Sequence, residues 1–296
     1  MDKSLHRGSL EMVAAMLISG TIGWLVMLSG QPVLDVVFWR CVFGALTLLV
    51  ICAGMGFLRP GLLNRTTFLL AVLSGVAIVG NWLLLFGSYS RASIAIGTAV
   101  YNVQPFMLVG LGALFLGEKI TLHKLFWLAV SFAGMLAIVS AHGGQGGNDY
   151  LMGIAMALGA AALYAIAALI IKRLKGIAPH LIALVQVTTG VLLLAPLADV
   201  SAFPHEFRGW GALLTLGIVH TGLMYVLLYG AIQKLPTALT GALSFIYPIV
   251  AIFVDWFAFG HRLEALQWAG VVAILLAAAG MQQGWGVHRA QPANAN

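Results

Sequence analysis

Residues 67–87 read TFLLAVLSGVAIVGNWLLLFG, a run without a charged side chain. As a helix rising 1.5 Å per residue, this run extends about 30 Å, the thickness of the hydrocarbon core of a bilayer. Nine similar runs flank it, at residues 10–29, 34–56, 92–116, 124–140, 151–171, 180–197, 210–231, 236–259 and 264–285. The sequence therefore predicts an all-α integral membrane protein with ten transmembrane helices.

The composition of the 296-residue chain leads to the same prediction. Apolar residues make up 61% and charged residues 8% of the chain, whereas a soluble domain has about 45–50% and about 25%. So few polar side chains cannot cover a surface that faces water. Disorder is excluded as well, because disordered chains are poor in apolar residues.

The basic residues indicate how the helices are oriented. Ten spans place both termini on one side, and that side carries Lys3, Arg7, Arg59, Arg65, Lys119, Lys124, Lys172, Arg173, Lys175, Lys234 and Arg289. The other side carries only Arg91, Arg208 and Arg262. Because basic loops stay in the cytoplasm, we expect both termini to be cytoplasmic. Nucleic acid is not an expected partner, since these charges are spread over many loops.

Ten spans divide into two sets of five. Because five is odd, a second copy of the same unit inserts upside down, as in the inverted repeats of secondary transporters. We expect one unit at residues 1–143, a second at 144–290 and a disordered tail at 291–296. A shift of 143 residues places Pro105 on Pro248, and each proline is expected to kink the span that contains it.

Two stretches carry a resemblance to a known family: Phe115-Leu116-Gly117-Glu118-Lys119-Ile120-Thr121 and Phe38-Trp39-Arg40. With ten spans in two similar halves, the chain resembles the EamA-type branch of the drug/metabolite transporter superfamily over nearly its whole length. It departs from that pattern at Gly260-His261, where Gly-Glu is usual. Within the branch it looks most similar to bacterial aromatic-amino-acid exporters, which implies a carrier of the bacterial inner membrane.

Polar residues in mid-span are costly in hydrocarbon, so they are expected to face protein or a water-filled cavity. Asn81 and Trp82 lie halfway along the third span. In the fourth span, the spacing of one helix face is occupied by Thr98, Tyr101, Asn102 and Pro105. Pro105 also leaves the carbonyl of Tyr101 without its usual helical donor. These residues predict a substrate cavity; the alternative is a proline kink that only packs against neighbouring helices.

The second half adds three candidates to this cavity, Tyr164, His220 and Ser244. Ser244 is placed there by the repeat, and Tyr164 is too central to be an interfacial anchor. His220 lies mid-membrane, where a histidine either relays protons or stays neutral and bonded to a neighbour.

Two charged residues lie inside spans, Arg40 and Asp255. The first is roughly 9 Å and the second roughly 6 Å below the outer ends of their helices. These similar depths permit an ion pair that closes an outer gate or is purely structural. The alternative is that both side chains extend outward to the interface.

The sequence thus predicts a secondary transporter that exports small neutral metabolites, above all amino acids, by alternating access through a central cavity. Its partners are a small-molecule substrate and the lipid bilayer, and nothing in the sequence indicates an oligomeric state. Export of lipophilic cations or drugs is the alternative, followed by a passive channel. An enzyme is not expected, and neither a cofactor nor a metal, because the chain has no His-Glu-x-x-His and no Walker motif.

Overall fold

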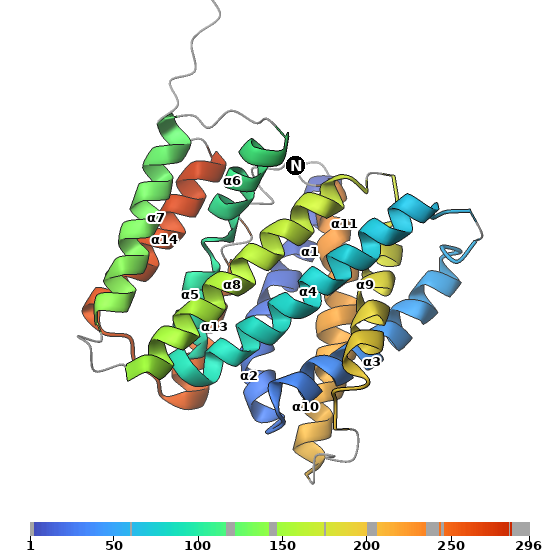
Figure 1. Ribbon diagram of the computed structural model, residues 1–296, viewed down its shortest axis with the longest axis horizontal. Coiled ribbons are helices and arrows are strands. Elements are labelled where there is room, and N and C mark those ends of the chain that lie inside the picture. Colours follow the sequence, from blue (N-terminus) through green and yellow to red (C-terminus); the bar gives the residue numbers. More distant parts are fainter. Residues whose placement is uncertain are drawn as a thin grey trace, which may run out of the picture.

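The computed structural model describes residues 3–59, 61–116, 122–141, 147–174, 176–199, 206–234, 243, 246–283 and 285. Every regular element among these residues is a helix, and Figure 1 shows the helices packed into one bundle. The first five predicted spans correspond to α1 (Lys3–Gly20) with α2 (Ile22–Leu28), α3 (Val33–Gly54), α4 (Arg65–Ala92), α5 (Ile94–Tyr101) with α6 (Gln104–Leu116), and α7 (Leu122–Ala141).

The second five spans also coincide with helices. They are α8 (Gly147–Lys172), α9 (Pro179–Leu194), α10 (Phe207–Gly217) with the π-helical segment η1 (Ile218–Leu223) and α11 (Met224–Lys234), α13 (Ile246–Phe259), and α14 (Ala265–Gln283). The predicted tail at 291–296 lies outside the described residues.

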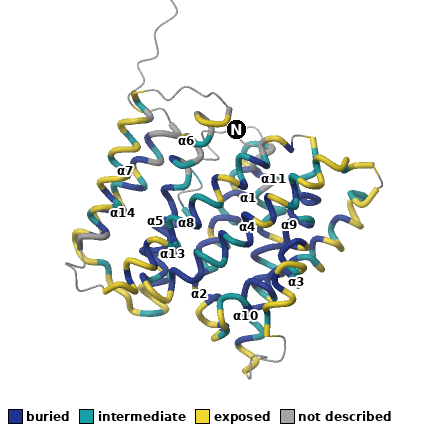
Figure 2. The backbone as a smooth tube through the Cα atoms, in the orientation of Figure 1, coloured by how far each residue is buried: buried dark blue, intermediate teal, exposed yellow. Residues whose placement is uncertain are grey.

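Length and surface identify these helices as membrane-spanning. Five described stretches are long and apolar enough to cross a bilayer: Ser4–Leu28, Val33–Gly54, Arg65–Ala92, Gly147–Ile171 and Phe207–Leu228. Large apolar side chains such as Val50, Leu192 and Phe257 are exposed on the outside of the bundle, and Figure 2 shows the buried residues gathered along its middle. An apolar exterior of this kind is suited to lipid.

The helix contacts have a two-fold pattern. Helix α4 packs on α8 as α11 packs on α1, and α5 packs on α8 as α13 packs on α1. Likewise α4 packs on α9 as α10 packs on α3. If each of the first five spans is exchanged with the span five places later, every one of these helix pairs becomes its counterpart. Three further pairs join equivalent spans of the two units and so remain the same pair: α3–α9, α5–α13 and α7–α14. The fold therefore consists of two equivalent five-helix units, and because each has an odd number of spans, the second is inverted relative to the first.

The contacts also show that the two units exchange helices. One group, which we call the α8 lobe, consists of α4, α5, α6 and α8; the other, the α1 lobe, consists of α1, η1, α11 and α13. Each lobe contains helices from both units. A relative movement of the lobes would therefore alter contacts across the centre while the paired helices stay together.

Pro105 does not act as predicted. The fourth span is interrupted between Tyr101 and Gln104, and Pro105 is the second residue of the new helix α6. Pro248 lies in α13, and residues 244 and 245 before that helix lie outside the described residues. The first turn of a helix tolerates proline because its N–H groups have no partner within the helix. Pro105 therefore follows a helix break, and the expected kink inside a continuous helix is wrong at that position.

Candidate substrate site

The guanidinium of Arg40 lies between the two lobes, 1% exposed. Its Cζ is 4.2 Å from the centre of the Trp82 ring and 5.6 Å from that of Phe86, both on α4. On the opposite lobe, Nε donates to Thr221 Oγ1 at 3.1 Å and Nη2 to the His220 carbonyl at 3.5 Å. Arg40 therefore connects α4 to the π-helical segment η1.

The π-helical geometry of η1 positions Thr221 and His220 for these contacts. Its wider turn pairs residues five apart and leaves groups of the ordinary helix ladder to be satisfied otherwise. Thr221 Oγ1 donates to the Leu216 carbonyl at 3.0 Å, and His220 Nδ1 bonds the Thr215 carbonyl at 3.1 Å. The same hydroxyl accepts the hydrogen bond from Arg40 Nε.

Glycine allows α3 and η1 to approach closely enough for this bond. A Cβ on Gly44, one turn after Arg40, would lie 2.6 Å from Thr221 Cγ2. The reciprocal contact is made by Gly222, where a Cβ would collide with Thr47. Small residues at such crossings let membrane helices pack backbone to backbone.

Aromatic side chains surround the guanidinium. The phenol groups of Tyr89, Tyr225 and Tyr247 are its further aromatic neighbours. Further along α5, the Tyr101 ring meets the Tyr164 ring edge to face at 6.0 Å. Trp82, Tyr101 and Tyr164, three predicted residues, all lie on helices of the α8 lobe, and Tyr164 is 39% exposed.

The amides of the predicted cavity are engaged with backbone. Asn81 Nδ2 donates to the Ala160 carbonyl at 2.7 Å, and Asn102 Nδ2 to the Thr98 carbonyl at 2.8 Å. Asn81 also lies beside the Tyr101 phenol. These bonds hold α4 against α8 and close the last turn of α5, so both amides position the aromatic region.

Thr98 and Ser244 complete the predicted set. Thr98 is buried beside the phenols of Tyr89 and Tyr247, but its Oγ1 forms no hydrogen bond of standard geometry with any described residue. Ser244 lies outside the described residues, as does the family motif from Gly117 to Thr121.

His220 is held at both ring nitrogens. Besides the bond to Thr215, its Nε2 lies 2.9 Å from Thr21 Oγ1, at the break between α1 and α2. The ring therefore joins the first span to the eighth. Of the two interpretations of this histidine, the contacts favour bonding to neighbours over a proton relay.

The ion pair between the two intramembrane charges is not formed. Asp255 Oδ2 accepts the Ala95 N–H at 2.9 Å, and Oδ1 lies 2.9 Å from His261 Nδ1. The carboxylate is fully buried and satisfies a donor in the first turn of α5, which begins after Ser93 in a positive-φ conformation of 78°. Asp255 thus caps α5 and contacts His261 instead of forming the expected ion pair with Arg40.

Several residues of this region were missed by the sequence reasoning. Phe86 and Tyr89 follow Trp82 at i+4 and i+7, so the face that they share with it was detectable from spacing. Thr221, next to His220 in sequence, was not predicted, because no sequence signal indicates the π-helix that turns both residues inward. His261 stands where the family usually has an acidic residue, and its contact with Asp255 required the tertiary structure.

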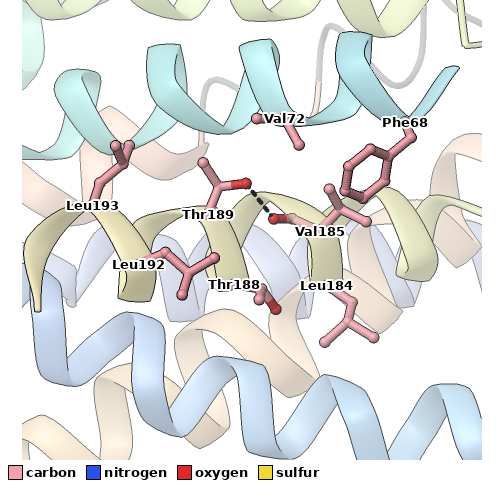
Figure 3. Close-up of a pocket in the computed structure, with 8 residues that line it drawn as sticks. All are labelled: Phe68, Val72, Leu184, Val185, Thr188, Thr189, Leu192 and Leu193. Atoms are coloured by element: carbon pink, nitrogen blue, oxygen red, sulfur yellow. Dashed lines mark hydrogen bonds between the residues drawn. The ribbon is translucent and has the colours of Figure 1, made fainter. Parts of the chain in front are cut away.

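An apolar groove of about 420 Å³ lies elsewhere, between α4 and α9 (Figure 3). Its lining residues are Phe68, Val72, Leu184, Val185, Thr188, Thr189, Leu192 and Leu193. The Thr189 hydroxyl is turned back to the Val185 carbonyl at 2.8 Å. The groove contains none of the predicted residues and presents almost no polar group, so it is not the candidate substrate site.

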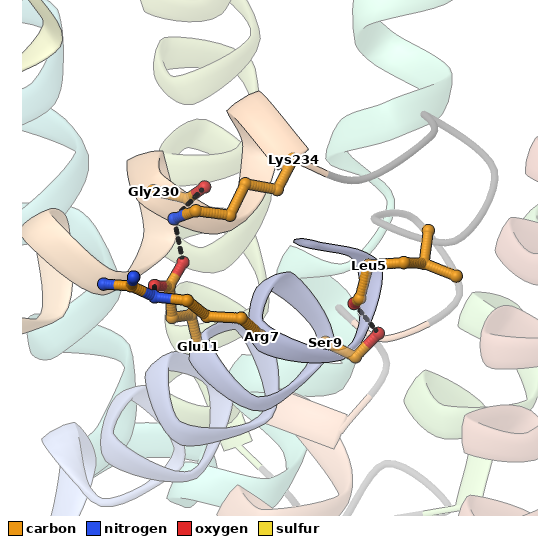
Figure 4. A network of polar contacts seen from close by, with 6 residues as sticks. All are labelled: Leu5, Arg7, Ser9, Glu11, Gly230 and Lys234. Carbon is orange, nitrogen blue, oxygen red and sulfur yellow. Dashed lines mark hydrogen bonds and ion pairs between the residues drawn. The ribbon is translucent and has the colours of Figure 1, made fainter. Parts of the chain in front are cut away.

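An ion network closes the α1 lobe near the N-terminus (Figure 4). Lys234 Nζ lies 2.6 Å from Glu11 Oε2, and Arg7 Nε lies 3.0 Å from Glu11 Oε1. In the α8 lobe, Arg91 Nε lies 3.2 Å from Asp149 Oδ1. Arg91 and Lys234 are equivalent under the 143-residue shift. Each lobe thus has a corresponding ion pair between its two units.

Two inverted five-helix units with a polar and aromatic centre define the class of protein as a membrane transporter. Comparison with known families agrees: the EamA-like transporter family matches residues 6–140 and again residues 151–282. The chain therefore belongs to this family, which is part of the drug/metabolite transporter superfamily.

Relatives extend over nearly the whole chain. "Uncharacterized transporter YxxF" of Bacillus subtilis is 30% identical over 276 residues, covering 92% of this chain and 88% of its own length. "Uncharacterized transporter YetK" of the same organism is 26% identical over 244 residues, 78% of this chain and 72% of its own. A solved crystal structure shares the fold, with a TM-score of 0.63 at 18% identity, over 92% of this chain and 95% of that one.

Proposed function

We propose that this multi-pass membrane transporter exports small neutral metabolites, chiefly amino acids, through the region between the α1 and α8 lobes. The observation that carries the proposal is the aromatic and hydroxyl-rich centre, with Trp82 and Tyr101 on one lobe and Tyr225 and Tyr247 on the other. Aromatic faces bind apolar side chains, and the phenols supply hydrogen bonds to a polar backbone.

The charge of the centre argues against lipophilic cations as substrates. Among the described residues, Arg40 is the charged group at this level of the lobe interface, and Asp255 is engaged by Ala95 and His261. A cationic drug would meet an unscreened positive charge in a medium of low dielectric constant. A neutral or zwitterionic substrate avoids this cost.

Alternating access is proposed to proceed by rocking of the two lobes. The contacts within each lobe join helices of both units, whereas the lobes meet where α5 packs on α13 and through the contacts of Arg40. We further propose that the protein lies in the bacterial inner membrane with both termini in the cytoplasm, on the strength of the distribution of Lys and Arg.

Uptake into liposomes tests this proposal. Purified protein is reconstituted and loaded with unlabelled neutral amino acids, and entry of labelled amino acids is compared with that of tetraphenylphosphonium. We expect saturable amino-acid uptake that is stimulated by counter-flow. Transport of the cation alone would refute the amino-acid proposal, and unsaturable flux without counter-flow would indicate a channel.

Two tryptophan variants test whether the substrate binds at the centre of the bundle. Trp82→Leu removes the central ring and should lower amino-acid uptake about tenfold, the effect of losing about 1.4 kcal/mol of aromatic contact. Trp268→Leu changes an exposed ring on the outside of the bundle and should leave uptake unchanged. Equal effects of the two substitutions would argue against a central site.

A further inference from the structure

We infer that the free edge of the Arg40 guanidinium binds the carboxylate of the transported substrate; this deepens the proposed function and rests on it. The starting point is a buried cation without a counter-ion. No described carboxylate forms an ion pair with Arg40. Removing a guanidinium from water is expensive unless an anion and hydrogen bonds compensate, so the protein maintains a charge that its own described side chains do not neutralise.

The hydrogen-bond inventory shows which edge is available. A guanidinium has five N–H groups. Nε uses its one hydrogen on Thr221, and Nη2 uses one at 3.5 Å on His220. Nη1 makes no hydrogen bond with any residue that the structure describes. The edge formed by Nη1 and Nη2 therefore retains three donors, and two of them match the two oxygens of a carboxylate.

The surroundings fix the plane of this edge. Trp82 covers one face of the guanidinium at 4.2 Å, and the Thr221 bond holds Nε on the opposite lobe. A preorganised fork loses less entropy on binding than a mobile one. The rings of Tyr89, Tyr225 and Tyr247 are further neighbours of the same group, and aromatic rings offer apolar surface to the rest of a small acid.

The charge occurs in only one of the two units. Under the 143-residue shift, the position of Arg40 corresponds to Ala183 on α9. One site thus receives one carboxylate. Because Arg40 is 1% exposed and its partners belong to both lobes, the site is closed in this conformation. Separation of α4 from η1 during rocking would open the edge to one side.

The test compares isosteric acid and amide probes. Thermal unfolding of the detergent-purified protein is measured with L-phenylalanine, with 3-phenylpropionate and with 3-phenylpropanamide. The amide differs from 3-phenylpropionate by the loss of the carboxylate charge. The wild type should bind both acids about 10- to 100-fold more tightly than the amide, the range of one charge-assisted hydrogen-bonded contact. Arg40→Gln should bind acid and amide equally, and Arg40→Lys should retain part of the preference.

These readouts separate a binding role from a structural one. Arg40→Met removes an uncompensated buried charge, so in the absence of ligand this variant should be as stable as the wild type. The preference for the acid is then measured on folded protein. Acid preference that persists in Arg40→Gln and Arg40→Met, or its absence from the wild type, overturns the inference. If 3-phenylpropionate binds through Arg40 but no amino acid is taken up by liposomes, the inference holds and the proposed amino-acid transport fails.

Discussion

Substitution of Gly270 by alanine should destabilise the contact between α7 and α14, which lie side by side at one edge of the bundle (Figure 1). A Cβ at Gly270 would collide with the Gly134 carbonyl oxygen and lie 2.7 Å from Ile138 Cγ1. A Cβ at Gly134 would lie 2.7 Å from the Gly270 carbonyl oxygen. Neither carbonyl can rotate away, because each belongs to a helix backbone, so the helices must separate.

The expected cost follows from this geometry. Ordinary contacts need 3.4 Å or more, so the helix axes must move apart by roughly 0.7 Å or more, an overpacking that typically costs about 1–3 kcal/mol. Alanine also stabilises a helix relative to glycine by up to about 1 kcal/mol. Gly110→Ala on α6 is the matched control, since its Cβ meets no atom of the described residues within 4 Å and should gain only the higher helix propensity of alanine.

Thermal unfolding in detergent measures the difference. At about 2–4 °C per kcal/mol for a chain of this size class, Gly270→Ala should unfold several degrees below Gly110→Ala. The double variant with Gly134→Ala should lose less than the sum of the two single losses, because the first substitution has already separated the helices. Equal midpoints for Gly270→Ala and Gly110→Ala would show that the two helices do not pack through their glycines.

Two further predictions concern polar contacts. Asp255→Ala should lower stability by about 1–3 kcal/mol, because the buried Ala95 N–H loses its acceptor; Asp255→Asn keeps an acceptor, so an alanine variant as stable as the asparagine variant in thermal unfolding would contradict this role. Charge reversal at both Glu11 and Lys234 should recover about 0.2–1 kcal/mol lost in the single reversals. A double-mutant cycle with no coupling would remove the pair from the forces that hold the α1 lobe together.

Much of the fold was predictable because hydropathy is a local property of the chain. The run at 67–87 must cross the hydrocarbon as a helix wherever its neighbours lie, since no other structure satisfies its backbone there. Counting such runs established ten spans, and the odd number in each half implied inversion. Trp82, Tyr101 and Tyr164 are predicted for a related reason, because large amphipathic residues in mid-span need a protein environment.

Partners across the bundle depended on tertiary structure. The similar depths of Arg40 and Asp255 permit an ion pair, but depth does not determine which way a helix is rotated about its axis. The rotation of α3 and the wider turn of η1 direct Arg40 to Thr221, 181 residues away in sequence. Asp255 instead accepts a hydrogen bond from the Ala95 N–H at the start of α5.

The sequence alone thus determined which segments enter the membrane, because transfer into hydrocarbon depends on each segment's own side chains. Only the tertiary structure decided where helices break and which polar groups meet between the lobes. Those outcomes depend on backbone hydrogen bonds at Asn102, at Thr221 and at the end of α4, where packing against other helices outweighs local preference.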